Sequence, residues 1–169
     1  MTILPIVTVP DPILKTISSP VDVVDDALRA LMDDMLHTMY AAPGIGLAAI
    51  QVGRPLRVLV MDLADDTENP RPQYFVNPQI TWASEELATY NEGCLSVPEQ
   101  YADIDRPAEC KISYLDYNGE QQDIHATGLF STCIQHEIDH LNGVIFIDYL
   151  SNLKKNMVIR KVKKLVKED

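Results

Sequence analysis

The 169-residue sequence contains few cysteines, only Cys94, Cys110 and Cys133. A disulfide-stabilised domain uses an even and usually larger number, so we expect a fold without disulfides in a reducing compartment. No run approaches the roughly 20 apolar residues that cross a bilayer, which argues against a membrane protein. The first basic residue is Lys15, so the N-terminus does not resemble a secretory signal or an Arg-rich transit peptide. We therefore expect a cytoplasmic protein.

Basic residues are also scarce, because 14 Lys and Arg stand against 25 Asp and Glu and the net charge is −11. This balance disfavours DNA as a partner, since phosphate binding requires a basic surface. The last 16 residues are the exception, with 7 basic against 2 acidic residues. The length and the 46% apolar content are typical of one globular domain. We expect a single catalytic domain over 1–169, with 152–169 as a basic C-terminal helix.

The apolar pattern predicts both helices and strands. Apolar residues recur at helical spacing from Leu28 to Met39, which predicts a helix capped by Asp25 or Asp26 and ended by Pro43-Gly44. Further helices are expected over 128–141 and from 152. Strand patterns lie between them, at 56–62, 74–77, 86–90, 110–117 and 121–127. Because the strands do not alternate regularly with helices, we expect an α+β fold.

Residues 136–140 read His-Glu-Ile-Asp-His, an H-E-x-x-H pattern on the expected helix 128–141. Histidines four residues apart lie on one helical face, so that His136 and His140 can bind one metal ion. Glu137 then lies beside the open coordination position, where it can move protons to and from water. The alternative is two surface histidines beside an unrelated glutamate, which we consider the weaker interpretation because the chain has only four histidines.

A catalytic site of this kind requires a third protein ligand. A third histidine at the usual downstream spacing is missing, because position 146 is Phe146, and no Glu follows roughly twenty residues on. Cys94, within the segment EGCLS and expected on a loop after a strand, is the upstream candidate. Cys110 and Cys133 fall in apolar patterns and are interpreted as small buried residues.

The segment GIGLAAIQ, from Gly44 to Gln51, contributes a third pattern. Its glycines permit close approach of a ligand to the backbone, and Gln51 offers a side-chain N–H. Taken together, GIGLAAIQ, EGCLS and HEIDH resemble the three signatures of peptide deformylase, in the same order and over essentially the whole chain, and the length is similar to the bacterial type I form. We expect mostly antiparallel strands around a central metal-binding helix, with a C-terminal helix.

The resemblance implies a hydrolase that removes the formyl group from the N-terminal N-formylmethionine of newly made polypeptides and releases formate. It implies that Cys94, His136 and His140 bind one Fe²⁺, a site that Ni²⁺, Co²⁺ or Zn²⁺ can also occupy. Glu137 would transfer the proton, while the Gln51 amide and the Leu95 backbone N–H stabilise the oxyanion. The methionine pocket would be built from Gly44, Ile45, Gly46, Leu95, Cys133 and His136.

Two positions depart from relatives at the substrate cleft. Thr132 stands where close relatives carry an apolar residue, and Tyr101 where some carry Arg, which affects the expected substrate preference but not the metal chemistry. We expect a monomer whose substrates are N-formylmethionyl nascent peptides.

The C-terminal helix is expected to be amphipathic. Its apolar side carries Val158, Ile159, Val162, Leu165 and Val166; its basic side carries Lys154, Arg160, Lys161, Lys163, Lys164 and Lys167; Lys155 alone lies within the apolar arc. The resemblance implies that this helix binds the ribosome, and the alternative is a basic face that is merely solvated.

Two other functions remain as alternatives. A zinc endopeptidase also uses H-E-x-x-H, but its downstream third ligand is missing here and Cys94 is unexplained. A non-catalytic metal-binding protein would require neither Glu137 nor Gln51. Hydrolysis of formyl-Met peptides beside digestion of casein distinguishes the three.

Overall fold

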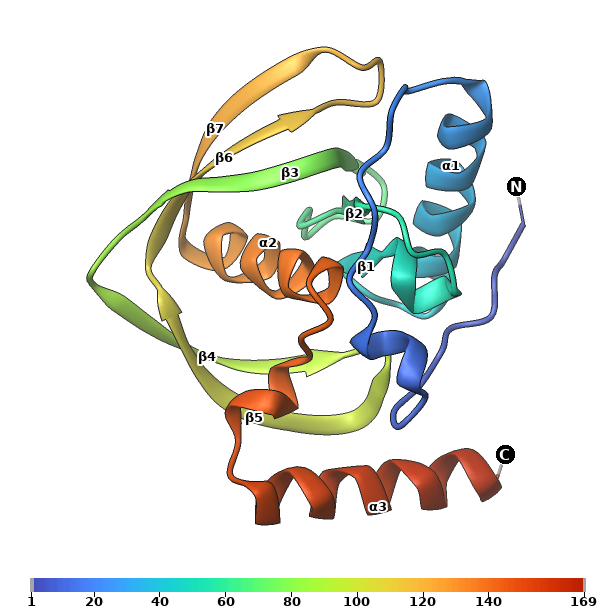
Figure 1. Ribbon diagram of the computed structural model, residues 1–169, viewed down its shortest axis with the longest axis vertical. Helices are drawn as coiled ribbons and strands as arrows, with labels where there is room; N and C mark the ends of the chain where they lie inside the picture. Colours follow the sequence, from blue (N-terminus) through green and yellow to red (C-terminus); the bar gives the residue numbers. More distant parts are fainter. Residues whose placement is uncertain (1, 169) are drawn as a thin grey trace.

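The computed structural model describes residues 2–168 (Figure 1). Its elements in chain order are η1 (Pro12–Lys15), α1 (Asp26–Ala41), β1 (Gly46–Ala48), η2 (Ala49–Val52), β2 (Val58–Met61), β3 (Gln73–Ala83), β4 (Leu87–Cys94), β5 (Val97–Pro107), β6 (Glu109–Leu115), β7 (Gln121–Thr127), α2 (Gly128–Leu141), η3 (Phe146–Tyr149) and α3 (Asn152–Glu168). The α+β expectation is confirmed.

The strands form two antiparallel sheets. Five strands pair in the order β1-β2-β3-β6-β7, and β4 and β5 form a separate hairpin. Helix α2 lies between the two sheets, inside the curve of β3, β6 and β7 (Figure 1). Thus the expected central helix, surrounded by antiparallel strands, is confirmed.

Strand β2 explains how the sheet holds helices on both faces. All four of its residues are buried, and alternate side chains point to opposite faces. Leu59 and Met61 pack with Ile134 and Ile138 of α2, whereas Val58 and Val60 pack in the core that α1 covers. An unbroken apolar run is therefore required here.

Several boundaries agree with the expectations from sequence. The side chain of Asp25 accepts a hydrogen bond from the Leu28 N–H at 2.9 Å and caps α1, as expected. Helix α2 spans the expected residues, and α3 begins at Asn152. Among the residues described, no helix is both long and apolar enough to cross a membrane.

The expectations were wrong around the β4–β5 hairpin. Strands β3 and β4 are longer than expected, and β5 was not predicted at all. Cys94 is the last residue of β4 and not part of a loop. Strand β5 contains Pro, Glu and Asp, which are depleted in strands, and it forms because it pairs with β4 along most of its length. The apolar run 144–147 leads into the short helix η3.

Helix α3 packs mainly on β5 and η3, and it lies at the bottom of Figure 1. Val158, Ile159 and Val162 contact a core formed with Val97 and other residues, whereas Val166 is 47% exposed and does not pack as expected. Lys155 interrupts the apolar arc because its ammonium group pairs with Asp148 at 2.5 Å.

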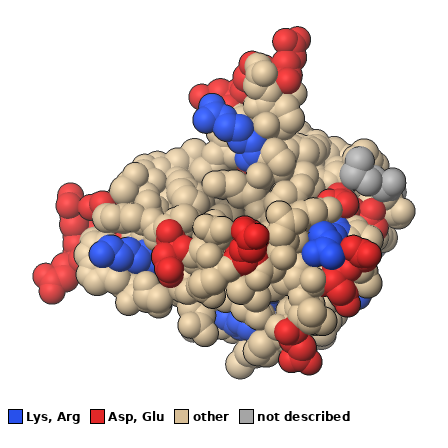
Figure 2. Space-filling view, turned by 90° about the horizontal axis from the view of Figure 1, so that it is seen from above, with Lys and Arg blue, Asp and Glu red and all other residues tan. Residues whose placement is uncertain are grey.

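The opposite side of the molecule carries mixed charge. Figure 2 looks down onto the end remote from α3, and acidic side chains there are interspersed with fewer basic ones. The six basic residues expected on the outer side of α3 are all exposed: Lys154, Arg160, Lys161, Lys163, Lys164 and Lys167. Positive charge is therefore concentrated on this one helix of an acidic protein.

Candidate metal centre

Cys94, His136 and His140 meet between β4 and α2. Their ligand atoms all lie within 4.8 Å of one another, and the Cys94 Sγ is 3.3 Å from the His140 Nε2. The two histidines are one helical turn apart on α2, and Cys94 reaches them from the end of β4. The structure therefore brings together all three of the ligands expected from the sequence.

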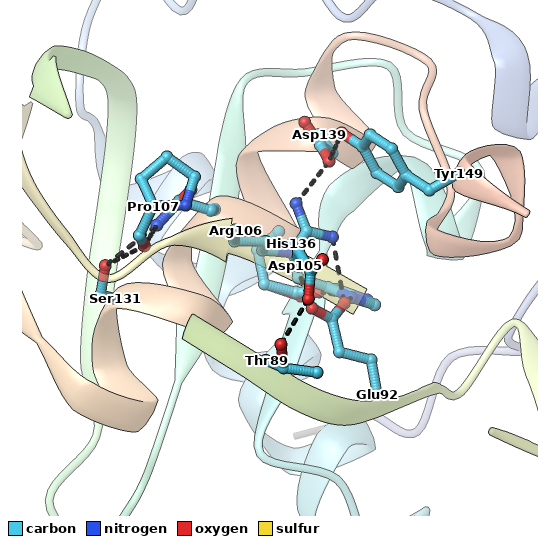
Figure 3. A network of polar contacts seen from close by, with 11 residues as sticks. Thr89, Glu92, Asp105, Arg106, Pro107, Ser131, His136, Asp139 and Tyr149 are labelled. Atoms are coloured by element: carbon cyan, nitrogen blue, oxygen red, sulfur yellow. Dashed lines mark hydrogen bonds and ion pairs between the residues drawn. The ribbon is translucent and has the colours of Figure 1, made fainter. Parts of the chain in front are cut away.

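A buried ion-pair network orients His136 (Figure 3). The His136 Nδ1–H donates to the Glu92 Oε1 at 2.9 Å, which leaves Nε2 free to face the centre. Arg106 holds Glu92 through two hydrogen bonds of 2.7 and 3.0 Å. Burial raises the pKa of Glu92, but the hydrogen bonds from His136 and Arg106 outweigh it and lower the pKa overall. Glu92 is therefore ionised and can fix the imidazole.

The network continues to the end of α2. Arg106 Nη1 donates to Asp139 Oδ2 at 2.8 Å, and the Tyr149 hydroxyl donates to the same oxygen at 2.6 Å. The Arg106 guanidinium also lies 5.2 Å from the centre of the Tyr149 ring. Our reasoning from sequence gave no role to Arg106. Arg106 follows Ala102 and Ile104 at every second position, which is the pattern of one face of a strand. This pattern was missed because β5 was not predicted.

Glu137 is the candidate proton carrier. Its side chain is buried, and its Oε1 lies 3.8 Å from the His136 Nε2 and 4.0 Å from the His140 Nε2. Within residues 2–168 its Oε2 has no hydrogen-bond partner. Burial raises the pKa of Glu137 to about 7, although the positive charges of His136 and Arg106 oppose the rise. The carboxylate can therefore both accept and release a proton near neutral pH.

Gly46 leaves room for the Glu137 side chain beside the backbone. A Cβ added to Gly46 would lie 3.0 Å from the Glu137 Oε2, closer than nearly all real contacts of this kind. At Gly44 a Cβ would lie 2.7 Å from the Cδ1 at the end of the Leu95 side chain, so that side chain would have to shift. The two glycines of GIGLAAIQ thus allow the backbone to approach the centre closely.

Gln51 is held with its amide group toward the cysteine. Its Oε1 accepts from the Ala48 N–H at 3.0 Å, and its Nε2 donates to the Ser96 Oγ at 3.0 Å. The same nitrogen lies 3.4 Å from the Cys94 Sγ. Gln51 is 1% exposed and does not line the cavity described next, so only its amide reaches the centre.

A cavity of about 730 Å³ opens beside the centre. It falls within the range that holds a drug-sized ligand, so it has room for more than one amino-acid residue. It is lined by all six expected pocket residues, which are Gly44, Ile45, Gly46, Leu95, Cys133 and His136, and also by Thr132 and Tyr101. Cys133 is half-buried in this wall, and burial raises the pKa of its thiol to about 12, so it is a neutral wall residue.

The donor set fits a divalent transition metal. One thiolate and two imidazoles are common ligands, and three protein ligands would leave a four-coordinate ion one position for catalysis. Burial is the largest cause that lowers the pKa of His140, which keeps that imidazole neutral and able to bind a cation. The donor set alone is compatible with iron and with zinc.

Comparison with known proteins identifies the family. The family model described as polypeptide deformylase matches residues 3–156. The chain belongs to this family. Peptide deformylase of Phenylobacterium zucineum is 63% identical over 167 residues and that of Mesorhizobium japonicum 56% over 168, with at least 96% of each chain covered. The crystal structure of peptide deformylase from Ehrlichia chaffeensis is 45% identical, with a TM-score of 0.95 over 99% of both chains.

Membership of the peptide deformylase family establishes the activity of the chain. The chain is a metal-dependent hydrolase that removes the N-formyl group from newly made polypeptides. The expected family and function are confirmed, and the endopeptidase and non-catalytic alternatives are not supported.

Proposed function

We propose that Cys94, His136 and His140 hold one Fe²⁺ and that the surrounding residues transfer the proton and stabilise the developing charge during deformylation. The convergence of these three side chains beside the buried Glu137 carries the proposal. When bound, the cation supplies Lewis-acid chemistry: it lowers the pKa of water and polarises the formyl carbonyl. Glu92 and Arg106 act through His136 by keeping its Nδ1 protonated and its ring in place.

Glu137 takes a proton from the attacking water and delivers it to the α-amine that leaves. Its position supports both transfers, because the buried Glu137 Oε1 lies 3.8 Å from the His136 Nε2 and, within the described residues, its Oε2 has no hydrogen-bond partner. The Gln51 amide and the Leu95 backbone N–H stabilise the negative charge that develops on the formyl oxygen. A single donor of this kind is typically worth about 3–4 kcal/mol in the transition state. Formate and a free N-terminal methionine result.

The methionine side chain of the substrate packs against an apolar wall of the cavity, beside His136. This wall is formed by Gly44, Ile45, Gly46, Leu95 and Cys133. Thr132 contributes a hydroxyl to the same cavity and is 4% exposed. An acetyl group in place of formyl would add a methyl group near Gly46, where Glu137 already approaches the backbone closely. Acetyl-Met peptides should therefore be much poorer substrates than formyl-Met peptides.

The decisive experiment combines activity with metal content. An anaerobic preparation is assayed for hydrolysis of formyl-Met and acetyl-Met peptides and for digestion of casein, and its metals are measured in the same sample. We expect formyl-specific hydrolysis, no casein digestion and about one iron per chain. Bound zinc with full activity would refute the assignment of iron. Casein digestion would refute the roles in deformylation proposed for Glu137, Gln51 and Leu95.

We infer that the enzyme works in the cytoplasm as a monomeric single domain, residues 1–169, and binds ribosomes through α3. Three free cysteines fit a reducing compartment. The ribosome proposal is supported by the six exposed basic residues on the outer side of α3, because ribosomal RNA is a polyanion. Sedimentation of the purified enzyme tests the monomer, and the experiment on α3 described below tests the ribosome contact.

A further inference from the structure

The N-terminal segment, residues 2–9, connects parts of the molecule that lie far apart in the sequence. It forms no helix or strand of its own and precedes η1 (Figure 1). Near its start, the N–H groups of Thr2 and Leu4 each donate to a side chain of α1 at 2.8 Å. We call residues 7–9 the strap, because they then run between η2 and the turn that joins β4 to β5.

Two backbone hydrogen bonds of the strap end at or beside the expected oxyanion donors. The Val7 N–H donates to the Gln51 carbonyl oxygen at 2.7 Å. The Val9 N–H donates to the Ser96 carbonyl oxygen at 2.9 Å. In the described part of the chain, the intervening Thr8 N–H makes no hydrogen bond. This alternation is typical of extended chain, so the strap binds both residues along one edge.

The two residues that the strap binds come from different sheets. Gln51 belongs to η2, which directly follows β1 of the five-stranded sheet, whereas Ser96 lies in the turn of the β4–β5 hairpin. Their side chains are also joined, because the Gln51 Nε2 donates to the Ser96 Oγ at 3.0 Å. Leu95, the other expected donor, directly precedes Ser96. The strap therefore closes a ring of hydrogen bonds that fixes one oxyanion donor relative to the other.

Burial anchors the strap on the hairpin side of this ring. Val9 is 4% exposed and belongs to the core that contains Val97 of β5, and Val7 packs against the same core. The side chains thus fix the strap to the hairpin, while the Val7 N–H reaches across to Gln51. Because this packing also stabilises the fold, a role in the reaction requires a test that separates the two.

We propose that Val7 is a positioning residue for deformylation, whose N–H holds Gln51 where its amide meets the negative charge on the formyl oxygen. The inference rests on the proposed role of Gln51. An oxyanion donor acts only if it points at the position that the oxygen occupies in the transition state. A displacement of about 1 Å can lower the rate about 100-fold. Because this stabilisation arises in the transition state, loss of the Val7 bond lowers kcat and leaves KM unchanged.

The test compares Val7→Pro with its matched control, Thr8→Pro. Each variant removes one N–H of the strap, and in the described chain only the Val7 group donates a hydrogen bond. Proline is compatible with extended chain of this kind. In hydrolysis of a short formyl-Met peptide, Val7→Pro should lower kcat about 10- to 100-fold, because the donor is displaced. KM and metal content should not change, and Thr8→Pro should retain the kcat of the unmodified enzyme.

A double-mutant cycle with Gln51→Ala shows whether Val7 acts through Gln51. In that background the amide is already lost, so adding Val7→Pro should lower kcat no further, whereas two independent effects would multiply. Val162→Ala is the control for packing, because Val162 is fully buried in the same core as Val9. Its thermal midpoint should fall at unaltered kcat. An equal further loss of kcat in the Gln51→Ala background would identify a merely structural role of Val7 and overturn the proposal.

A second form of the Val7 change avoids proline. Nonsense suppression with the α-hydroxy acid of valine replaces the Val7 N–H by an ester oxygen and keeps the side chain, so this protein should fold even if Val7→Pro does not. It should show the same loss of kcat, and the corresponding ester at Thr8 should not. An unaltered kcat of the Val7 ester would overturn the proposal while the function stands. An unaltered kcat in Gln51→Ala would overturn the proposed role of Gln51 as well.

Discussion

At the scale of single residues, Glu137 is buried beside two histidines, and one of its oxygen atoms has no hydrogen-bond partner in the described part of the chain. Glu137→Gln preserves size and polarity but cannot accept the proton of water. We expect the metal to remain bound while kcat falls about 100-fold or more, since proton transfer by a positioned side chain contributes about this much. The measurement is kcat with metal content on the same sample, and near-normal turnover with metal bound would remove Glu137 from the mechanism.

The raised pKa of Glu137 also predicts how stability varies with pH in the metal-free protein. Burial disfavours the charged carboxylate, so folding is penalised once the group ionises. The penalty is absent below the ordinary pKa of 4.5 and complete above about 7, and a shift of this size is worth about 3 kcal/mol. Chelator-treated Glu137→Gln should therefore gain stability over the unmodified protein in urea unfolding at pH 8 but not at pH 4. A difference independent of pH would contradict this.

Arg106 illustrates a residue that acts only through another one. Arg106→Leu removes the cationic partner of the buried Glu92, which keeps only its hydrogen bond from His136, and removing one partner of a buried ion pair typically costs about 3–5 kcal/mol. His136 also loses its support, so metal affinity should fall about 10- to 100-fold. Arg106→Lys should restore only part of the metal affinity, because an ammonium group does not reproduce the two bonds that the guanidinium group makes to Glu92. Competition with a chelator measures the affinity, and unchanged affinity in Arg106→Leu would exclude this positioning role.

At the scale of elements, one face of α3 packs on the body of the protein and the opposite, basic face is exposed. Val162 is fully buried, whereas the basic residues on the outer side are exposed. Changing Lys161, Lys163, Lys164 and Lys167 to Gln retains good helix formers and leaves the buried face intact. Hydrolysis of short formyl peptides should be unchanged, while co-sedimentation with ribosomes at low salt should drop sharply. If the variant co-sediments like the parent, the basic face is only solvated.

At the scale of the whole molecule, the metal centre joins the two sheets. Its proposed ligands come from β4 of the hairpin and from α2, which packs on the five-stranded sheet. A cation at 100 times its Kd stabilises a fold by about 2.7 kcal/mol, which corresponds to roughly 5–10 °C in a protein of this size. Chelation should lower the thermal midpoint by this amount, and His140→Ala should show no such shift. An unmodified protein with an unaltered midpoint would show that the ion contributes nothing to stability.

The sequence by itself determined the parts of this protein that depend on local spacing. The helical period placed α1 and α2, and a local capping signal placed the start of α1, because such signals lie within a few residues of one another. The four-residue spacing of His136 and His140 fixed two ligands on one face of a helix. Elimination then left Cys94 as the candidate for the third ligand, and three co-occurring motifs indicated the family.

Only the tertiary structure decided the remainder, because it depends on pairing between distant segments. Strand β5 has unfavourable composition and exists because β4 pairs with it. Without β5 the inward position of Arg106 was invisible, and with it the network that holds Glu92 and His136. The same pairing sets Tyr101 over Gly93 at the cavity mouth. Burial, which raises the pKa of Glu137, likewise arises only when α2 is enclosed between the two sheets.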